Sequence, residues 1–158
     1  MMSHKTIKSA MILAMTLIFS APLYNITPAR SESKPLVDLS IKTKGIMDAP
    51  SAFEKAKNGE IILLDIRSPQ EWKETGTGSG AKRVSMHQPG FLQKLDALTG
   101  NDKSKPVALI CATGGRSNWL QGELVKRGYT NIIDVSEGML GSSTGPGWLK
   151  RGLPVVKN

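Results

Sequence analysis

Cysteine and histidine are scarce in this sequence, and that scarcity excludes several kinds of site. The 158-residue chain has one cysteine, Cys111, and two histidines, His4 and His87. One cysteine cannot form an internal disulfide, and so few soft ligands give a zinc site no support. A protease that pairs cysteine with histidine would depend on His87 alone. We therefore expect neither a metal nor a cofactor.

Aromatic residues and long apolar runs are also in short supply. The lysines are scattered with no aromatic interleaving, and the chain has only three tryptophans and two tyrosines, which argues against nucleic-acid binding. The apolar run from Ala10 to Ala21 has twelve residues and stops at Pro22. It is shorter than the roughly 20 residues that a membrane-spanning helix needs. A permanent membrane anchor is therefore the less favoured interpretation of this run.

The residues around the apolar run instead indicate a secretory signal peptide. Basic residues precede it, and the small residues Ala29 and Ser31 follow it, as at a cleavage site. Cleavage fits after Ala29 or after Ser31, so we expect residues 1–31 to be removed. A lipoprotein is excluded because no cysteine lies nearby, and a mitochondrial presequence would be amphipathic and rich in arginine. We expect export to a bacterial periplasm, with an uncleaved N-terminal membrane anchor as the alternative.

Export changes the charge of the chain and the meaning of its cysteine. The full sequence carries a net charge of +8, and residues 1–31 contain three basic residues and no acidic one. The remaining chain keeps 18 basic and 13 acidic residues, a net charge of +5. This moderate charge suits small anionic ligands or simply solubility. A lone cysteine in an exported protein is either buried and inert or free and reactive.

The rest of the sequence alternates between strand and helix patterns. Such alternation predicts an α/β fold, a mostly parallel sheet with helices on both faces and right-handed crossovers. We expect residues 32–45 to form a linker and an N-terminal strand, and residues 46–156 to form one domain. The expected strands are residues 36–41, 60–66, 84–86, 107–110 and 132–135, and the expected helices are residues 48–58, 68–72, 91–98 and 116–126.

Cys111 stands where a buried strand ends and a glycine-rich turn begins. Ligands of parallel sheets bind at the carboxyl ends of the strands. Gly114 and Gly115 permit the positive φ angles of a nest of inward-pointing N–H groups, and a helix begins directly after them. These groups, the charge of Arg116 and the hydroxyl of Ser117 should stabilise a thiolate at Cys111. The turn therefore predicts a nucleophile in an anion-binding loop.

The loop Cys-Ala-Thr-Gly-Gly-Arg-Ser resembles the active-site loop of single-domain rhodaneses, the thiosulfate sulfurtransferase superfamily. Residues 64–72 are similar to the family's Asp-Val-Arg…Glu-aromatic segment. Further matches in the same order are Gly76, Gly80, Ala81, Gly128, Tyr129, Glu137, Gly138, Trp148 and residues 152–155. Thr77 replaces a common histidine and Glu137 a common glycine, and we expect only local structural consequences from both.

The resemblance implies a rhodanese-like fold over residues 46–156 and an exported sulfurtransferase. Cys111 would take sulfane sulfur from thiosulfate or a similar donor as a persulfide. A thiophilic acceptor, either cyanide or a thiol and including the thiol of a protein, would then remove that sulfur. The anion-binding residues would be Ala112, Thr113, Gly114, Gly115, Arg116 and Ser117.

Two alternative functions remain open. A rhodanese-like module could bind an anion or present a persulfide to a partner without turnover. Dual-specificity phosphatases and arsenate reductases use similar loops, but the phosphatase loop has five residues between cysteine and arginine. This chain has four between Cys111 and Arg116, a cradle too narrow for a phosphate ester.

Other conspicuous residues are expected to be structural. Arg67 and Glu71 are four residues apart and are predicted to pair, while Asp65 would cap or connect neighbouring loops. Trp119, Trp148 and the leucine stripes of the helices are predicted to pack in the core rather than to form a substrate platform.

Overall fold

The computed structural model describes residues 45–157. The expected signal peptide at residues 1–31 and the expected strand at residues 36–41 lie outside this range. Within residues 45–157, no helix has both the length and the apolar character required to cross a membrane.

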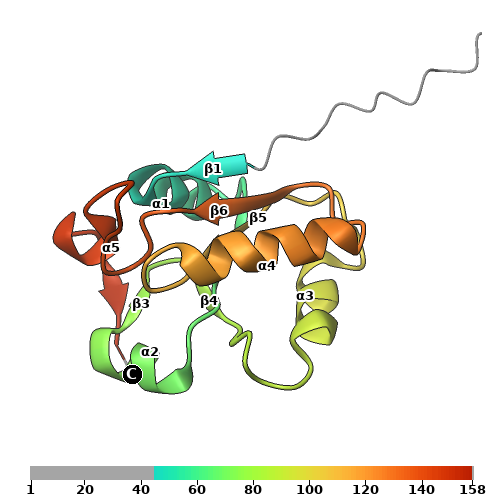
Figure 1. Ribbon diagram of the computed structural model, residues 1–158, viewed down its shortest axis with the longest axis horizontal. Coiled ribbons are helices and arrows are strands. Elements are labelled where there is room, and N and C mark those ends of the chain that lie inside the picture. The colour runs from blue at the N-terminus through green and yellow to red at the C-terminus, as the bar shows by residue number, and fades with distance from the viewer. Residues whose placement is uncertain (1–44, 158) are drawn as a thin grey trace, which may run out of the picture. The chain divides into compact units, whose positions relative to one another are not determined.

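Five parallel strands form the central sheet, in the order β1-β6-β5-β2-β4 (Figure 1). This arrangement confirms the predicted parallel sheet and places β5 in the middle. Because β5 and β2 are neighbours, the segments that follow their carboxyl ends meet at one edge of the sheet. The strands are β1 (Gly45–Met47), β2 (Ile62–Asp65), β4 (Lys82–Arg83), β5 (Val107–Ile110) and β6 (Ile132–Val135).

Helices cover both faces of the sheet, as predicted. They are α1 (Ala49–Lys57), α2 (Pro69–Thr75), α3 (Phe91–Thr99), α4 (Gly115–Lys126) and α5 (Gly147–Lys150). Asp48 caps α1 by accepting a 2.9 Å hydrogen bond from the Ser51 backbone. Ser68 and Glu71 form a reciprocal capping box at the start of α2.

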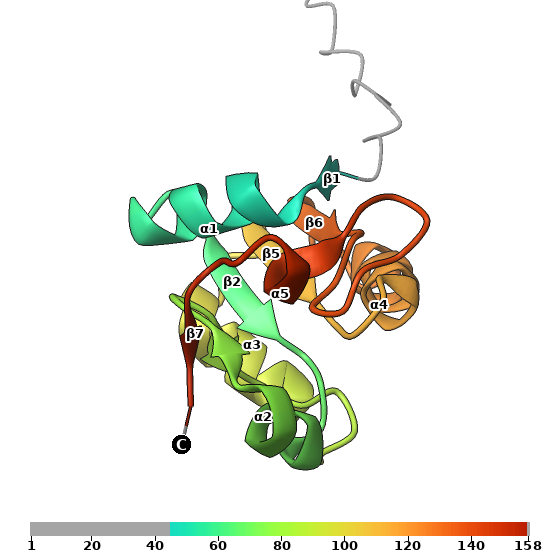
Figure 2. The ribbon, with the colours of Figure 1, turned by 90° about the vertical axis from the view of Figure 1, so that its left-hand side faces the viewer.

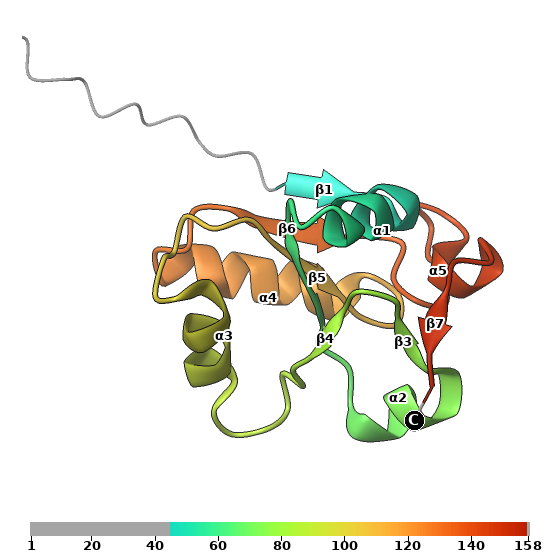
Figure 3. The same cartoon turned by 180° about the vertical axis from the view of Figure 1, so that it is seen from behind.

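Alternate residues of each central strand enter two separate hydrophobic clusters. Leu64 packs with α3 and α4, whereas its neighbour Leu63 packs with α1 and α5. Helix α4 accordingly lies in front of the sheet in Figure 1 and behind it in Figure 3. A parallel sheet buried on both faces explains why its strands are aliphatic without polar alternation.

Two short strands are not among the strands expected from the sequence. β3 (Thr77–Gly78) pairs in antiparallel fashion with β7 (Val155–Val156), and Figure 2 shows this pair near α2. The strand expected at residues 84–86 instead lies at Lys82–Arg83, although the Val84 N–H still donates to the Asp65 carbonyl at 3.1 Å.

One tryptophan predicted to lie in the core is exposed. Trp148 is fully buried, as expected, but Trp119 is 59% exposed and Val125 is 47% exposed. The buried face of α4 consists instead of Ser117, Leu120, Gln121 and Leu124. Trp119 therefore does not pack in the core.

Candidate active site

Cys111 directly follows β5, the middle strand of the sheet. Its residue surface is 1% exposed, and it packs with the hydrophobic cluster beneath α3 and α4. The loop residues above it differ in exposure, since Gly114 and Ser117 are buried, whereas Thr113 and Gly115 are exposed. The sulfur thus lies at the floor of the loop, where bulk water has little access.

The hydroxyl of Ser117 is the side-chain partner of the thiol. Ser117 Oγ lies 3.4 Å from Cys111 Sγ and donates to the Gly114 carbonyl at 3.0 Å. A serine hydroxyl has one proton, so in this arrangement the thiol donates and the hydroxyl accepts. Once Cys111 loses its proton, rotation of the hydroxyl directs the serine proton to the sulfur. Ser117 can therefore serve both forms of the thiol.

The loop owes its shape to one of its two glycines. Gly114 has φ +84°, and a Cβ there would lie 2.1 Å from the Ser136 carbonyl oxygen. Gly115 is not in the positive-φ region and has open space around it, so the expectation that both glycines adopt positive φ is wrong for Gly115. The loop therefore requires glycine at position 114, whereas position 115 has room for a side chain.

Two carbonyl groups of the loop accept hydrogen bonds from the chain that follows β6. The Met139 N–H donates to the Cys111 carbonyl, and the Leu140 N–H donates to the Ala112 carbonyl, both at 2.8 Å. Within residues 45–157, the backbone N–H groups of residues 112–117 have no protein acceptor. Unpaired N–H groups at the start of a helix are suited to bind an anion.

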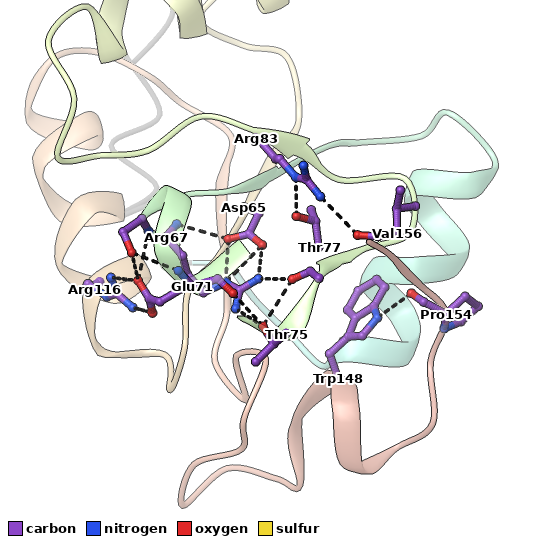
Figure 4. A network of polar contacts seen from close by, with 12 residues as sticks. Asp65, Arg67, Glu71, Thr75, Thr77, Arg83, Arg116, Trp148, Pro154 and Val156 are labelled. Carbon is purple, nitrogen blue, oxygen red and sulfur yellow. Dashed lines mark hydrogen bonds and ion pairs between the residues drawn. The ribbon is translucent and has the colours of Figure 1, made fainter. Parts of the chain in front are cut away.

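Arg116, the cation of the loop, forms an ion pair with Glu71 of α2 (Figure 4). Its Nη1 and Nη2 atoms donate to the two carboxylate oxygens at 3.0 and 2.5 Å. This hydrogen bonding lowers the pKa of Glu71 from 4.5 to about 2. It also raises the pKa of Arg116, with a smaller contribution from the nearby Cys111. Both charges therefore persist over the whole working pH range.

The predicted pairing of Arg67 with Glu71 is wrong, because Arg67 pairs with Asp65. The two side chains are at most 1% exposed, and Arg67 Nη2 lies 2.6 Å from Asp65 Oδ2. The same guanidinium donates to Thr75 Oγ1 at 2.7 Å, as Figure 4 shows. It also donates to the Gly76 carbonyl at 2.6 Å. Asp65 and Arg67 thus connect β2 to the end of α2.

His87 lies at the rim of this site. Its Nε2 atom is 3.4 Å from Arg116 Nη1, and the residue is exposed. Sequence reasoning weighed this histidine only as a protease base and as a metal ligand. In the structure it contacts the loop's arginine, and its exposed ring faces solvent.

The two departures from the family pattern make local contacts. Thr77 Oγ1 accepts from Arg83 Nε at 2.6 Å, and the buried Glu137 accepts from Arg151 Nε at 2.7 Å. Among residues 45–157, no group of three histidine, cysteine, aspartate or glutamate side chains is placed to hold a metal ion. The site is therefore built from one thiol, a hydroxyl, backbone N–H groups and an ion pair.

Sequence reasoning missed Glu71 as a neighbour of the loop from Cys111 to Ser117. The available signal was strand order: α2 follows β2, the loop follows β5, and these two strands are adjacent. The adjacency of β2 and β5 cannot be deduced from residue spacing along one segment. Ala112 and Thr113, which lie beside Cys111, carry no charge that could indicate an acidic neighbour such as Glu71.

Comparisons with known proteins agree with this geometry. The chain is 26% identical over 112 residues to a sulfurtransferase of Allochromatium vinosum, covering 70% of this chain and 92% of that protein. It is 27% identical over 119 residues to thiosulfate sulfurtransferase 16, chloroplastic, of Arabidopsis thaliana, covering 66% and 92%. The solution structure of the polysulfide-sulfur transferase homodimer of Wolinella succinogenes is 29% identical, with a TM-score of 0.52 and coverage of 73% and 80%.

A family match covers most of the folded part of the chain. Residues 49–143 match the rhodanese-like domain, and these residues include the whole loop from Cys111 to Ser117. Because the match spans more than half of the sequence, this protein belongs to the rhodanese-like domain family.

Proposed function

We propose that this chain is an exported sulfurtransferase. It moves sulfane sulfur from thiosulfate or a similar donor to a thiophilic acceptor through a persulfide on Cys111. The observation that carries the proposal is the position of that thiol: it lies on the floor of a loop whose N–H groups have no protein acceptor among the described residues. The sulfurtransferase names of two relatives and the polysulfide-sulfur transferase structure support the same chemistry.

In the first step, the Cys111 thiolate attacks the outer sulfur of thiosulfate. A new S–S bond forms, the original S–S bond breaks, and its electron pair leaves with sulfite. The backbone N–H groups of residues 112–117 stabilise the negative charge on the bound sulfur species. The hydroxyl of Ser117 donates to the thiolate before the attack.

In the second step, cyanide or a thiolate attacks the outer sulfur of the persulfide. The S–S bond breaks, and its electron pair returns to Cys111 as the thiolate. The two half-reactions give ping-pong kinetics. Because the sulfur sits at the floor of the loop, the acceptor must be small or must present its thiol on a protruding group, as a protein acceptor could.

Intact mass spectrometry of residues 32–158 after exposure to thiosulfate tests the proposal. We expect a gain of about 32 Da, one sulfur atom, on Cys111. We also expect release of sulfite and, with cyanide, formation of thiocyanate. Cys111→Ser should abolish all three, because the chain has no other cysteine.

Different failures have different meanings. A persulfide that forms but does not turn over with cyanide or thiols indicates the binding or sensing module instead. Turnover that survives Cys111→Ser contradicts the mechanism. A phosphatase assay with a phosphate ester serves as the negative control for the narrow loop.

The location is part of the same proposal. We propose that residues 1–31 direct export to the periplasm and are then removed. Fractionation of a bacterial host, followed by N-terminal sequencing of the exported chain, tests this. The expected new N-terminus follows Ala29 or Ser31, whereas a full-length chain in the membrane fraction supports the anchor.

A further inference from the structure

The positive charge of the loop is already neutralised inside the protein. Both terminal nitrogens of Arg116 donate to Glu71, and the two side chains are 31% and 27% exposed. A bidentate arginine–carboxylate pair is among the stronger and more oriented hydrogen-bonded contacts. For Arg116 to grip a substrate anion with the same two nitrogens, it would have to leave Glu71.

Glu71 is itself fixed and cannot easily move aside. Its Oε2 atom accepts 3.0 Å hydrogen bonds from the backbone N–H and the hydroxyl of Ser68, which completes the capping box of α2. Pro69 at the first position of the helix restricts the same turn. Moving the carboxylate would break the helix cap as well as the ion pair.

The neighbouring charges also cancel. Asp65 and Arg67 form a second, fully buried ion pair that leads from β2 to α2. The remaining loop residues carry no charge: Ala112, Thr113, Gly114, Gly115 and Ser117. His87, whose Nε2 atom also approaches Arg116, is exposed to solvent. The thiolate therefore faces neutral donors and a paired arginine rather than a free cation.

We propose that Glu71 is a specificity-determining residue that disfavours the dianion thiosulfate and favours thiol persulfides as sulfur donors. This inference rests on the proposed function and names its donor class. With a persulfide R–S–SH, the Cys111 thiolate attacks the outer sulfur. The S–S bond of the donor then breaks, the electron pair leaves as the thiolate RS⁻, and the Cys111 persulfide keeps the proton.

The charges along the two reactions explain the preference. Attack on thiosulfate brings three negative charges together, whereas attack on a protonated persulfide involves one. The loop's N–H groups can stabilise the negative charge in either reaction. The fixed carboxylate of Glu71, paired with Arg116, repels the thiosulfate dianion more strongly than it repels a neutral persulfide. In water two unit charges 4 Å apart interact by about 1 kcal/mol, so one charge acting on a dianion at roughly twice that separation changes a rate about fivefold.

Glu71→Gln is the matched test. Glutamine can keep the capping-box contacts with Ser68 while removing the negative charge. Glu60→Gln is the control, since it removes the same charge from the Lys55 pair that precedes β2, at the opposite edge of the sheet from the loop. For each protein, kcat/KM is measured at low salt with thiosulfate and with the persulfide of cysteine.

We expect Glu71→Gln to raise kcat/KM for thiosulfate about fivefold, mainly through KM, and to change the persulfide value less than about twofold. Glu60→Gln should leave both values unchanged. An unchanged ratio of the two donors in Glu71→Gln, or a fall in the thiosulfate value, overturns the proposal.

Two further measurements separate this proposal from the proposed function. In a Cys111→Ser background, calorimetry should show that adding Glu71→Gln tightens thiosulfate binding, and equal binding with and without that change contradicts the inference. If Glu71→Gln does not fold, the salt dependence of the wild type decides: kcat/KM for thiosulfate should stay constant or rise with ionic strength, because salt screens the repulsion between the thiolate and the dianion. A steep fall argues against neutralisation. If no donor transfers sulfur to Cys111, the proposed sulfurtransferase activity itself is refuted.

Discussion

The buried ion pair of Asp65 and Arg67 makes the fold depend on a single arginine. Arg67 makes contacts with a strand end, a helix end and the Gly76 carbonyl from a position that is 1% exposed. Removing its charge leaves the Asp65 carboxylate buried without a counterion. Such a loss costs far more than the pair itself contributes.

We therefore expect Arg67→Met to lower the free energy of unfolding by about 3–5 kcal/mol. Urea denaturation followed by circular dichroism measures this. Lys55→Met, which breaks an exposed pair with Glu60, should cost less than about 1 kcal/mol. Similar losses for both variants would show that water reaches Asp65.

Two adjacent glycines in the loop that follows Cys111 should respond differently to alanine. At Gly114 the backbone has φ +84° and a Cβ would meet the Ser136 carbonyl at 2.1 Å, whereas at Gly115 nothing lies within 4 Å. Gly114→Ala should cost about 1–3 kcal/mol from backbone strain alone and should block persulfide formation on Cys111. Gly115→Ala should keep both stability and sulfur uptake, as thermal melts and intact mass can show. Equal behaviour of the two variants would contradict the loop geometry.

Residue spacing predicted the wrong partner for Arg67 for a physical reason. The four-residue rule applies within a helix, but Ser68 is the N-cap of α2, so Arg67 precedes the helix. Its side chain turns back to Asp65, while Glu71 faces the loop after β5. Spacing predicted the positions of Cys111 and Arg116 well, because those lie on one short segment.

At the scale of the element, α4 shows how a buried face can include polar residues. Gln121 is fully buried, and its Nε2 atom donates at 2.8 Å to the carbonyls of Gly45 and Ile132. A sequence pattern assigns glutamine to the surface and tryptophan to the core. The buried face predicted for α4 therefore includes Trp119 and leaves out Gln121. Gln121 is buried because the backbone carbonyls of β1 and β6 accept its hydrogen bonds. No pattern within the helix contains that information.

Because Trp119 is exposed, we expect its side chain to contribute little to stability. Trp119→Ala should change the free energy of unfolding by less than about 0.5 kcal/mol, because surface substitutions seldom cost more. Leu124→Ala, in the same helix but fully buried, should cost about 2–5 kcal/mol. Chemical denaturation of both variants compares them, and a large loss from Trp119→Ala would place its ring in the core.

The capping box of α2 gives the fold a dependence on pH. Hydrogen bonding to Arg116 lowers the pKa of Glu71 to about 2, below its usual value of 4.5. A carboxyl group with a depressed pKa stabilises the fold above the unfolded pKa and loses this contribution as pH falls. The contribution is therefore complete above about pH 4.5 and disappears as pH approaches about 2.

Wild type and Glu71→Gln should differ in unfolding free energy on the order of 1 kcal/mol at pH 7, since the pair is partly exposed. The difference should shrink steadily between pH 4.5 and pH 2. Urea unfolding at several pH values measures it. A difference that grows on acidification would contradict the role of the ionised carboxylate.

At the scale of the whole molecule, long aliphatic strands were predictable and the shortest strands were not. β5 matches its expected bounds of residues 107–110, because four consecutive apolar residues in a buried strand leave a clear pattern. β3 and β7 have two residues each and lie far apart in the sequence. Their pairing is fixed by the packing around Trp148, which local sequence does not encode.

Trp148 joins the C-terminal segment to the rest of the molecule. It packs edge-on against Phe53 of α1 with ring centroids 5.8 Å apart, and its Nε1 atom donates to the Pro154 carbonyl at 2.9 Å (Figure 4). A Cβ on Gly78 of β3 would lie only 2.7 Å from the indole. The ring thus contacts a helix, a strand and the chain end together.

Trp148→Phe should therefore weaken the whole fold rather than release one segment. The smaller ring loses the hydrogen bond to Pro154 and leaves a cavity against Gly78, at a cost of about 2–4 kcal/mol. Because the ring's contacts come from one cooperative core, far-UV circular dichroism and tryptophan fluorescence should report a single coincident transition at lower urea concentration. The fluorescence of the variant comes from Trp72 and Trp119. If that fluorescence and the helical signal changed at different urea concentrations, the fold would not unfold as one unit.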